Sequence, residues 1–120
     1  MAREWYALTD DDLSTTPLVL AEADHLASTR GSQQAVMALR ADIRAGAYII
    51  DWWTAAASEA ADVADRYSDL GIGLTDASLV VLAARVGTVD IATFDERQFR
   101  AIVPLSGGAA FRLLPLDDPR

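Results

Sequence analysis

The sequence predicts an α/β fold, in which helices pack on both faces of a mostly parallel sheet. Short β-branched or aromatic runs alternate with segments of helical periodicity along the whole chain. At 120 residues the chain has the length of one domain with one hydrophobic core. No internal repeat or low-complexity linker marks a boundary, so residues 1–120 are predicted to form a single domain.

The first half of the chain is predicted to contain a strand, two helices and a second strand. The strand covers residues 13–16, and Thr16 then caps a helix that has Pro17 in its first turn and stops at Gly31. Ser32 caps the second helix, whose apolar residues at 36, 39 and 43 are spaced three and four apart. Residues 47–52 are β-branched and aromatic and should form a strand. At the end of this strand, the adjacent Trp52 and Trp53 are expected to point to opposite faces.

The second half continues the alternation. Thr54 is expected to cap a long Ala-rich helix, and Thr75 a shorter one that ends at Gly87. The predicted elements are a helix to residue 70, a loop at 71–74, a helix at 76–86, a strand at 89–94, a helical turn at 96–100 and a strand at 111–114.

Charge and composition narrow the classes of function. The net charge is −8, and an acidic chain binds nucleic acid poorly unless its carboxylates lie where divalent cations offset them. No apolar run is long enough to span a membrane, and residues 1–6 do not resemble a signal peptide. The chain has no Cys, which excludes thiolate metal sites and fits a cytoplasmic location.

Three carboxylates stand at positions that suggest a shared site. Glu22 falls between Leu18 and Leu26 on a predicted helix, in the middle of the apolar arc; the simpler interpretation is an edge residue that reaches water. Asp76 opens a helix and shares its apolar face, although an acid there also suits the helix dipole. Asp95 follows the strand at 89–94, where it could equally form a capping box.

In an α/β fold, these three residues are expected to lie close together at one edge of the sheet. Helix starts and strand carboxyl ends lie at the same edge of the sheet, so the carboxylates would repel one another unless a hard cation lies between them. Oxygen ligands without Cys favour Mg²⁺ or Mn²⁺ over Zn²⁺. Such an ion activates water and stabilises a leaving oxygen in phosphoryl chemistry.

The segments around these acids resemble the motifs of a known family. TPLVLAEADHL at residues 16–26, GLTDASLVVLA at 73–83 and IATFDERQF at 91–99 are similar to the second, third and fourth acidic motifs of bacterial PIN-domain toxins. The likeness is closest to VapC toxins of VapBC toxin–antitoxin modules. It implies a PIN-like three-layer α/β/α sandwich.

The resemblance also implies an activity and partners. It implies a Mg²⁺-dependent endoribonuclease, with Mn²⁺ as a substitute, that hydrolyses structured RNA such as tRNA or rRNA. Homodimers and inhibition by a VapB-like antitoxin are implied as well. By motif position, Asp76 and Asp95 would hold the metal, Glu22 would hold or orient metal and water, and Thr75 would support the site.

The sequence departs from the family at its start. The family begins with a central strand that carries an Asp, followed by a helix, and residues 3–6 look like the last turn of that helix. We therefore expect the domain to be incomplete at the N-terminus through a wrong start, a cut or degeneration. Asp10, Asp11 and Asp12 cannot replace the missing Asp, because they precede the strand that leads to Glu22. A form without the central strand should be unstable or completed by another chain, with weak or absent catalysis.

Two further functions remain open on the sequence alone. The fold could persist as a noncatalytic module for dimerisation or antitoxin binding. A small-molecule enzyme that binds phosphate at a helix N-terminus is the other option, but the sequence contains no Gly-rich phosphate loop.

Overall fold

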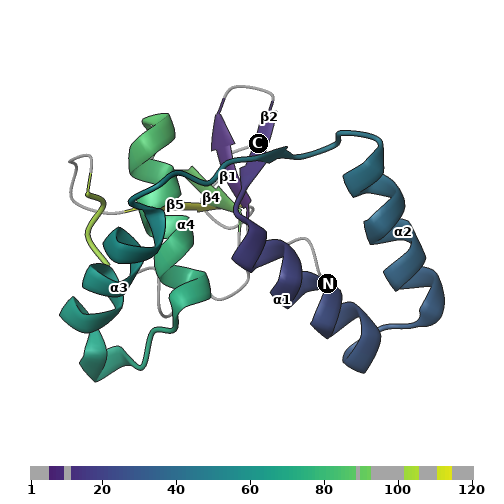
Figure 1. The fold of residues 1–120 in the computed structure, drawn as a ribbon, viewed down its shortest axis with the longest axis horizontal. Helices are drawn as coiled ribbons and strands as arrows, with labels where there is room; N and C mark the ends of the chain where they lie inside the picture. The colour runs from purple at the N-terminus through teal and green to yellow at the C-terminus, as the bar shows by residue number, and fades with distance from the viewer. Residues whose placement is uncertain (1–5, 10–11, 89, 93–101, 106–110, 115–120) are drawn as a thin grey trace.

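The computed structural model describes residues 6–9, 12–88, 90–92, 102–105 and 111–114. Helices flank a small sheet in this part of the chain (Figure 1). The elements are β1 (Tyr6–Thr9), β2 (Asp12–Thr15), α1 (Pro17–Arg30), α2 (Gln33–Arg44), β3 (Ile49–Ile50), α3 (Ala56–Arg66), a 3₁₀ helix (Ser68–Leu70), α4 (Leu74–Val86), β4 (Asp90–Ala92) and β5 (Arg112–Leu114). The predicted α/β class is confirmed.

The sheet has the strand order β3-β2-β1-β4-β5. Its two outer pairs are parallel: β2 pairs with β3, and β4 pairs with β5. The two pairs that β1 makes are antiparallel, with Ala7 opposite Ser14 on β2 and opposite Ile91 on β4. The parallel pairs agree with the expected α/β arrangement, and the antiparallel ones arise from a strand that the sequence analysis did not predict.

Strand β1 corrects the prediction for the N-terminal segment. Tyr6 was expected at the end of a helix, but it opens the strand at the centre of the sheet. Tyr and Thr favour extended backbone. Because β1 lies between β2 and β4, it gives both strands hydrogen-bonding partners along their inner edges. The centre of the sheet is therefore occupied by residues of this chain.

Helices α1 and α2 begin as predicted, and α1 also ends as predicted. The Thr16 hydroxyl accepts a hydrogen bond from the Val19 amide at 3.2 Å, and the Ser32 hydroxyl accepts one from the Ala35 amide at 3.1 Å. Each hydroxyl satisfies an amide that has no partner within the helix. At the far end of α1, the Gly31 amide donates to the Ala27 carbonyl.

Helix α3 differs from the prediction at both ends, and α4 differs at its start. Thr54 is not a cap, because a turn precedes α3 and Ala55 stands at its N-cap. The α-helix stops at Arg66, and residues 68–70 tighten into a 3₁₀ turn. Helix α4 starts earlier than expected, with Gly73 at the N-cap, so Thr75 is already helical. Gly87 ends α4 with φ of 77°, a conformation that favours glycine.

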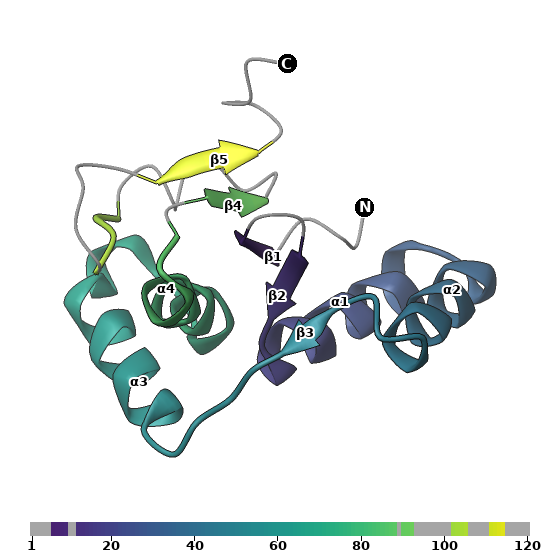
Figure 2. The same ribbon diagram turned by 90° about the horizontal axis from the view of Figure 1, so that it is seen from above.

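Helix α4 lies at the centre of the hydrophobic core. All residues from 77 to 83 are buried, and the main core cluster combines the apolar ones with Val19, Val63, Ile72 and Ile102, among others. Helix α3 lies beside α4, whereas α1 and α2 form a hairpin on the other side of the molecule (Figure 2). Among the described residues, no helix is long and apolar enough to span a membrane.

An ion pair joins the two helices of the α1–α2 hairpin. Arg40 donates two hydrogen bonds to the Asp24 carboxylate, at 2.8 and 3.0 Å. This hydrogen bonding, together with charge attraction, holds the pKa of Asp24 below its ordinary value of 3.8. A carboxyl whose folded-state pKa is lowered stabilises the fold above the unfolded-state pKa and loses that contribution as the pH falls through the folded-state pKa.

We predict that Asp24→Asn lowers the thermal unfolding midpoint at pH 7, because it removes the ion pair with Arg40. The decrease should be only about 1–3 °C, because exposed ion pairs contribute little to stability. The difference from the unmutated chain should vanish below the lowered pKa and shrink in high salt. Thermal melts between pH 2 and 7 measure it. Asp42→Asn, at an exposed position on α2, is the matched control. A difference that does not shrink as the pH falls below 3.8 would contradict the assignment.

Candidate functional site

Glu22 lies on the exposed flank of α1. The residues that α1 buries are Val19, Leu20, Ala23 and Ala27, whereas Leu18 and Leu26 are only half-buried. The prediction that Glu22 sits in the middle of the buried arc is therefore wrong. The structure supports the simpler interpretation, in which the carboxylate stands at the edge of the arc and reaches water. In this position Glu22 is accessible to a ligand.

Asp76 lies in the first turn of α4 and is half-buried. The apolar residues with which it was expected to share a face, Leu79, Val80 and Ala83, are all buried. A carboxylate in a first turn is stabilised by the positive end of the helix dipole. The Asp76 side chain therefore stands at the boundary between the core and solvent.

A buried pair of hydroxyl groups joins the starts of α1 and α4. The Thr16 and Ser78 oxygens are 2.8 Å apart, although the residues are 62 positions apart in the sequence. The Ser78 hydroxyl also donates to the Thr75 carbonyl at 2.6 Å. We call these two side chains the Thr16–Ser78 hydroxyl pair. Through this pair, the start of α1, which carries Glu22, directly contacts the start of α4, which carries Asp76.

The third predicted acid, Asp95, lies outside the described residues. Within the described ranges, no group of three or more His, Cys, Asp or Glu side chains is close enough to hold a metal ion. The structure thus brings together two of the three segments that carry the predicted acids, and the three-acid cluster remains a prediction.

Sequence reasoning missed the buried hydroxyl groups at the end of β2 and on α4. Ser14, Thr15, Thr16 and Ser78 are all buried, and Thr15 Oγ1 is the one buried side-chain polar atom of the described residues that has no hydrogen-bond partner. Thr16 was recognised only as a helix cap. The available signal was a hydroxyl residue inside an apolar helical run, as in Ser78 between Ala77 and Leu79. Such a residue needs a buried partner.

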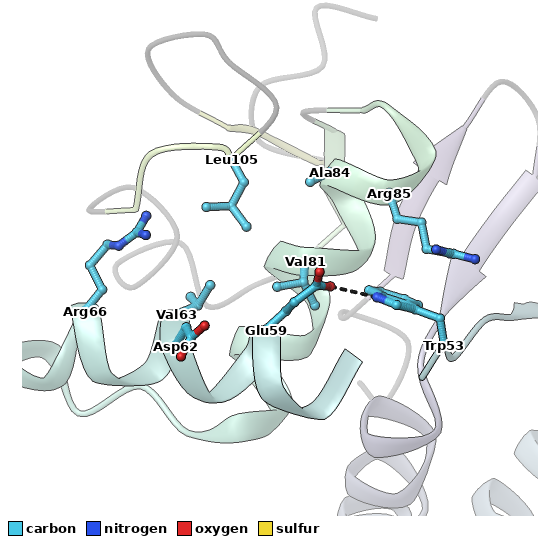
Figure 3. A pocket seen from close by; sticks show the side chains of 9 residues that line it. All are labelled: Trp53, Glu59, Asp62, Val63, Arg66, Val81, Ala84, Arg85 and Leu105. Carbon is cyan, nitrogen blue, oxygen red and sulfur yellow. Dashed lines mark hydrogen bonds between the residues drawn. The ribbon is translucent and has the colours of Figure 1, made fainter. Parts of the chain in front are cut away.

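A separate pocket of about 550 Å³ lies between α3 and α4 (Figure 3). Arg85 forms an ion pair with Asp51 at 3.1 Å, and its guanidinium lies 4.6 Å from the Trp53 ring centroid. The Trp53 indole donates to Glu59 at 2.7 Å. The pocket is lined by Trp53, Glu59, Asp62, Val63, Arg66, Val81, Ala84, Arg85 and Leu105, so it includes neither Glu22 nor Asp76.

The two tryptophans beside this pocket do not point to opposite faces. Their ring centroids are 6.0 Å apart and the rings are tilted by 50°. Strand β3 ends at Ile50, so the alternation expected of a strand does not extend to Trp52 and Trp53. The prediction of opposite faces was wrong because the strand is shorter than predicted.

Comparisons with known proteins identify the family of this chain. The PIN domain matches residues 1–103 of the chain. Ribonuclease VapC26 of Mycobacterium tuberculosis (strain ATCC 25618 / H37Rv) is 38% identical over 106 residues, which cover 88% of this chain and 78% of that protein. The resemblance seen in the acidic motifs is thereby confirmed. The chain belongs to the PIN-domain family and is of the VapC type.

Proposed function

We propose that this chain is a metal-dependent endoribonuclease of a toxin–antitoxin module. The observation that carries the proposal is the contact between the starts of α1 and α4, which brings together two of the acid-bearing segments of the family. The 38% identity to a ribonuclease, over most of both chains, supports the same activity. Structured RNA such as tRNA or rRNA is the proposed substrate.

The residue types at the site fit a hard divalent cation. Glu22 is exposed and Asp76 is half-buried, so both carboxylates can reach a ligand, and both offer only oxygen atoms. Oxygen ligands favour Mg²⁺ or Mn²⁺. We propose that Asp76 and Asp95 bind the ion and that Glu22 binds it or orients a water molecule. When bound, the ion would lower the pKa of water and stabilise charge on the leaving oxygen.

The protein itself supplies position and charge. Helix α4 fixes the backbone of Asp76 because its next seven residues are buried. Glu22 lies on the solvent side of α1 and can approach a substrate that comes from outside. Because the chain carries a net charge of −8, RNA binding at this acidic site requires the cation to offset phosphate repulsion.

The partners of this chain and its cellular location are proposed from its similarity to VapC toxins and from its composition. A VapB-like antitoxin is the proposed inhibitor, a homodimer the proposed assembly and the cytoplasm the proposed compartment. The similarity to a VapC protein supports the first of these. The absence of Cys is compatible with a reducing compartment.

One observation favours a second candidate, a noncatalytic module for dimerisation or antitoxin binding. The resemblance implies an Asp on the central strand, but the central strand β1 has the sequence YALT and carries no acid. A site with fewer carboxylates would bind the cation more weakly. The two candidates therefore differ in whether the chain binds a divalent cation.

We predict that Asp76→Asn lowers the rate of RNA cleavage by about 100-fold, because it removes a charged metal ligand and leaves the side-chain volume unchanged. Cleavage of total tRNA and rRNA by the purified chain, followed on gels, measures the effect. Asp62→Asn, an exposed acid on α3 in the separate pocket, is the matched control and should cleave at the unmutated rate. Equal activity of Asp76→Asn and the unmutated chain would exclude the proposed site.

We predict that removing divalent metal with a chelator abolishes cleavage and that Mn²⁺ or Mg²⁺ restores it. Calorimetry should detect Mn²⁺ binding to the unmutated chain and to Asp62→Asn, and much weaker binding to Asp76→Asn. If the unmutated chain binds a VapB-like peptide but no Mn²⁺, the noncatalytic candidate is correct. RNA cleavage that survives complete metal removal would contradict both the metal-dependent nuclease and the noncatalytic module.

A further inference from the structure

We propose that Thr16 and Ser78 are positioning residues, whose hydroxyl pair sets the tilt of α1 against α4 and thereby the separation of Glu22 from Asp76. The inference rests on the proposed function, because that function gives the separation its importance. Neither residue is proposed to touch metal or RNA. Their effect is exerted through the two helices that carry the acids.

The neighbouring hydrogen bonds determine which hydroxyl of the pair donates and which accepts. The Ser78 hydroxyl donates its proton to the Thr75 carbonyl at 2.6 Å, so its oxygen is available to accept. The Thr16 oxygen already accepts from the Val19 amide, so its own proton is free to donate to Ser78 at 2.8 Å. Each hydroxyl therefore donates one bond and accepts one, and each side chain is fully buried.

This pair joins the N-cap of α1 to the second turn of α4. Ser78 lies one turn after the start of α4, and Thr16 is the residue directly before α1. Removing one hydroxyl would leave a buried polar group without its partner, which costs far more than losing an exposed hydrogen bond. The start of α1 is therefore joined to α4 by a buried hydrogen bond whose loss is costly, in addition to the apolar packing of Val19.

The rest of α1 is less firmly tied to the core. Within the described residues, Val19 is the member of α1 that belongs to the main core cluster, and it lies one turn beyond Thr16. The other end of α1 packs on α2, and the α1–α2 hairpin extends away from the α3–α4 side of the molecule (Figures 1 and 2). The direction of the hairpin therefore depends on contacts near Thr16.

A small change of tilt would move Glu22 appreciably. Glu22 lies six residues beyond Thr16, which corresponds to about 9 Å along the axis of α1, whereas Asp76 and Ser78 are separated by about 3 Å along the axis of α4. A tilt of about 10° at Thr16 would shift the Glu22 backbone by about 1.5 Å relative to Asp76. Displacements of about 1 Å are enough to impair a metal or catalytic site.

The first experiment measures Mn²⁺ affinity by calorimetry in Ser78→Ala, which removes the pair but leaves the Thr16 cap in place. We expect the affinity to fall by about 10-fold, as is typical when a residue that orients ligands is lost. Thr16→Ser keeps both hydroxyl bonds and should bind Mn²⁺ like the unmutated chain. Val63→Ala, a buried change on α3, controls for lost stability and should lower the unfolding midpoint without changing the affinity.

The second experiment tests the geometry without metal or RNA. The chain has no Cys, so Arg30→Cys and Leu74→Cys, both at exposed positions, can carry spin labels at the far end of α1 and the start of α4. We expect the distribution of distances between the two labels, measured by electron paramagnetic resonance, to broaden or shift in Ser78→Ala. It should remain unchanged in Val63→Ala.

The outcomes separate the two proposals. If the unmutated chain binds no Mn²⁺, the proposed function fails, while the spin-label distances still decide whether the pair sets the helix tilt. If the unmutated chain binds Mn²⁺ and Ser78→Ala binds it equally well, the positioning role is excluded and the proposed function stands. An unchanged distance distribution in Ser78→Ala also overturns the inference.

Discussion

The architecture depends on the burial of α4. Its residues from 77 to 83 are all buried, so the helix cannot rotate without exposing large apolar side chains. Each of these Leu or Val residues contributes about 1.5–3 kcal/mol when fully buried. Helix α3, strand β1 and the start of α1 all pack against α4. The position of Asp76 in the first turn of α4 is therefore fixed by the core itself, and the start of α1, which precedes Glu22, packs against the same helix.

Local chemistry in the sequence predicted the starts of α1 and α2 and the end of α4, but not the ends of α3 or the start of α4. Thr16, Ser32 and Gly87 act as expected because capping depends only on neighbouring backbone groups. The burial of Glu22 was predicted wrongly for a different reason. Hydropathy gave most weight to Leu18 and Leu26, whereas α1 buries the small residues Ala23 and Ala27. A small side chain lets a neighbouring helix approach closely, and periodicity alone does not show which neighbour will do so.

Contacts between distant segments could not be predicted from local patterns. Strand β1 forms because β2 and β4 both offer it hydrogen-bonding edges, a condition that residues 6–9 do not reveal. The Thr16–Ser78 hydroxyl pair likewise depends on two helix starts that meet across 62 residues. The acids were proposed from motif spacing, whereas the hydroxyl contact between two of the helices that carry them was not foreseen. Motif residues can thus be recognised in a sequence, but the tertiary packing that supports them cannot.

The central claim is that carboxylates from separate parts of the chain surround one divalent cation. Anomalous diffraction from crystals soaked in Mn²⁺ tests this claim most directly, because the signal locates the ion without reference to activity. The account predicts a single strong peak within ligand distance of Asp76 and Asp95, with Glu22 bound directly or through water. A peak elsewhere, for example in the pocket between α3 and α4, or no peak at saturating Mn²⁺, would contradict it.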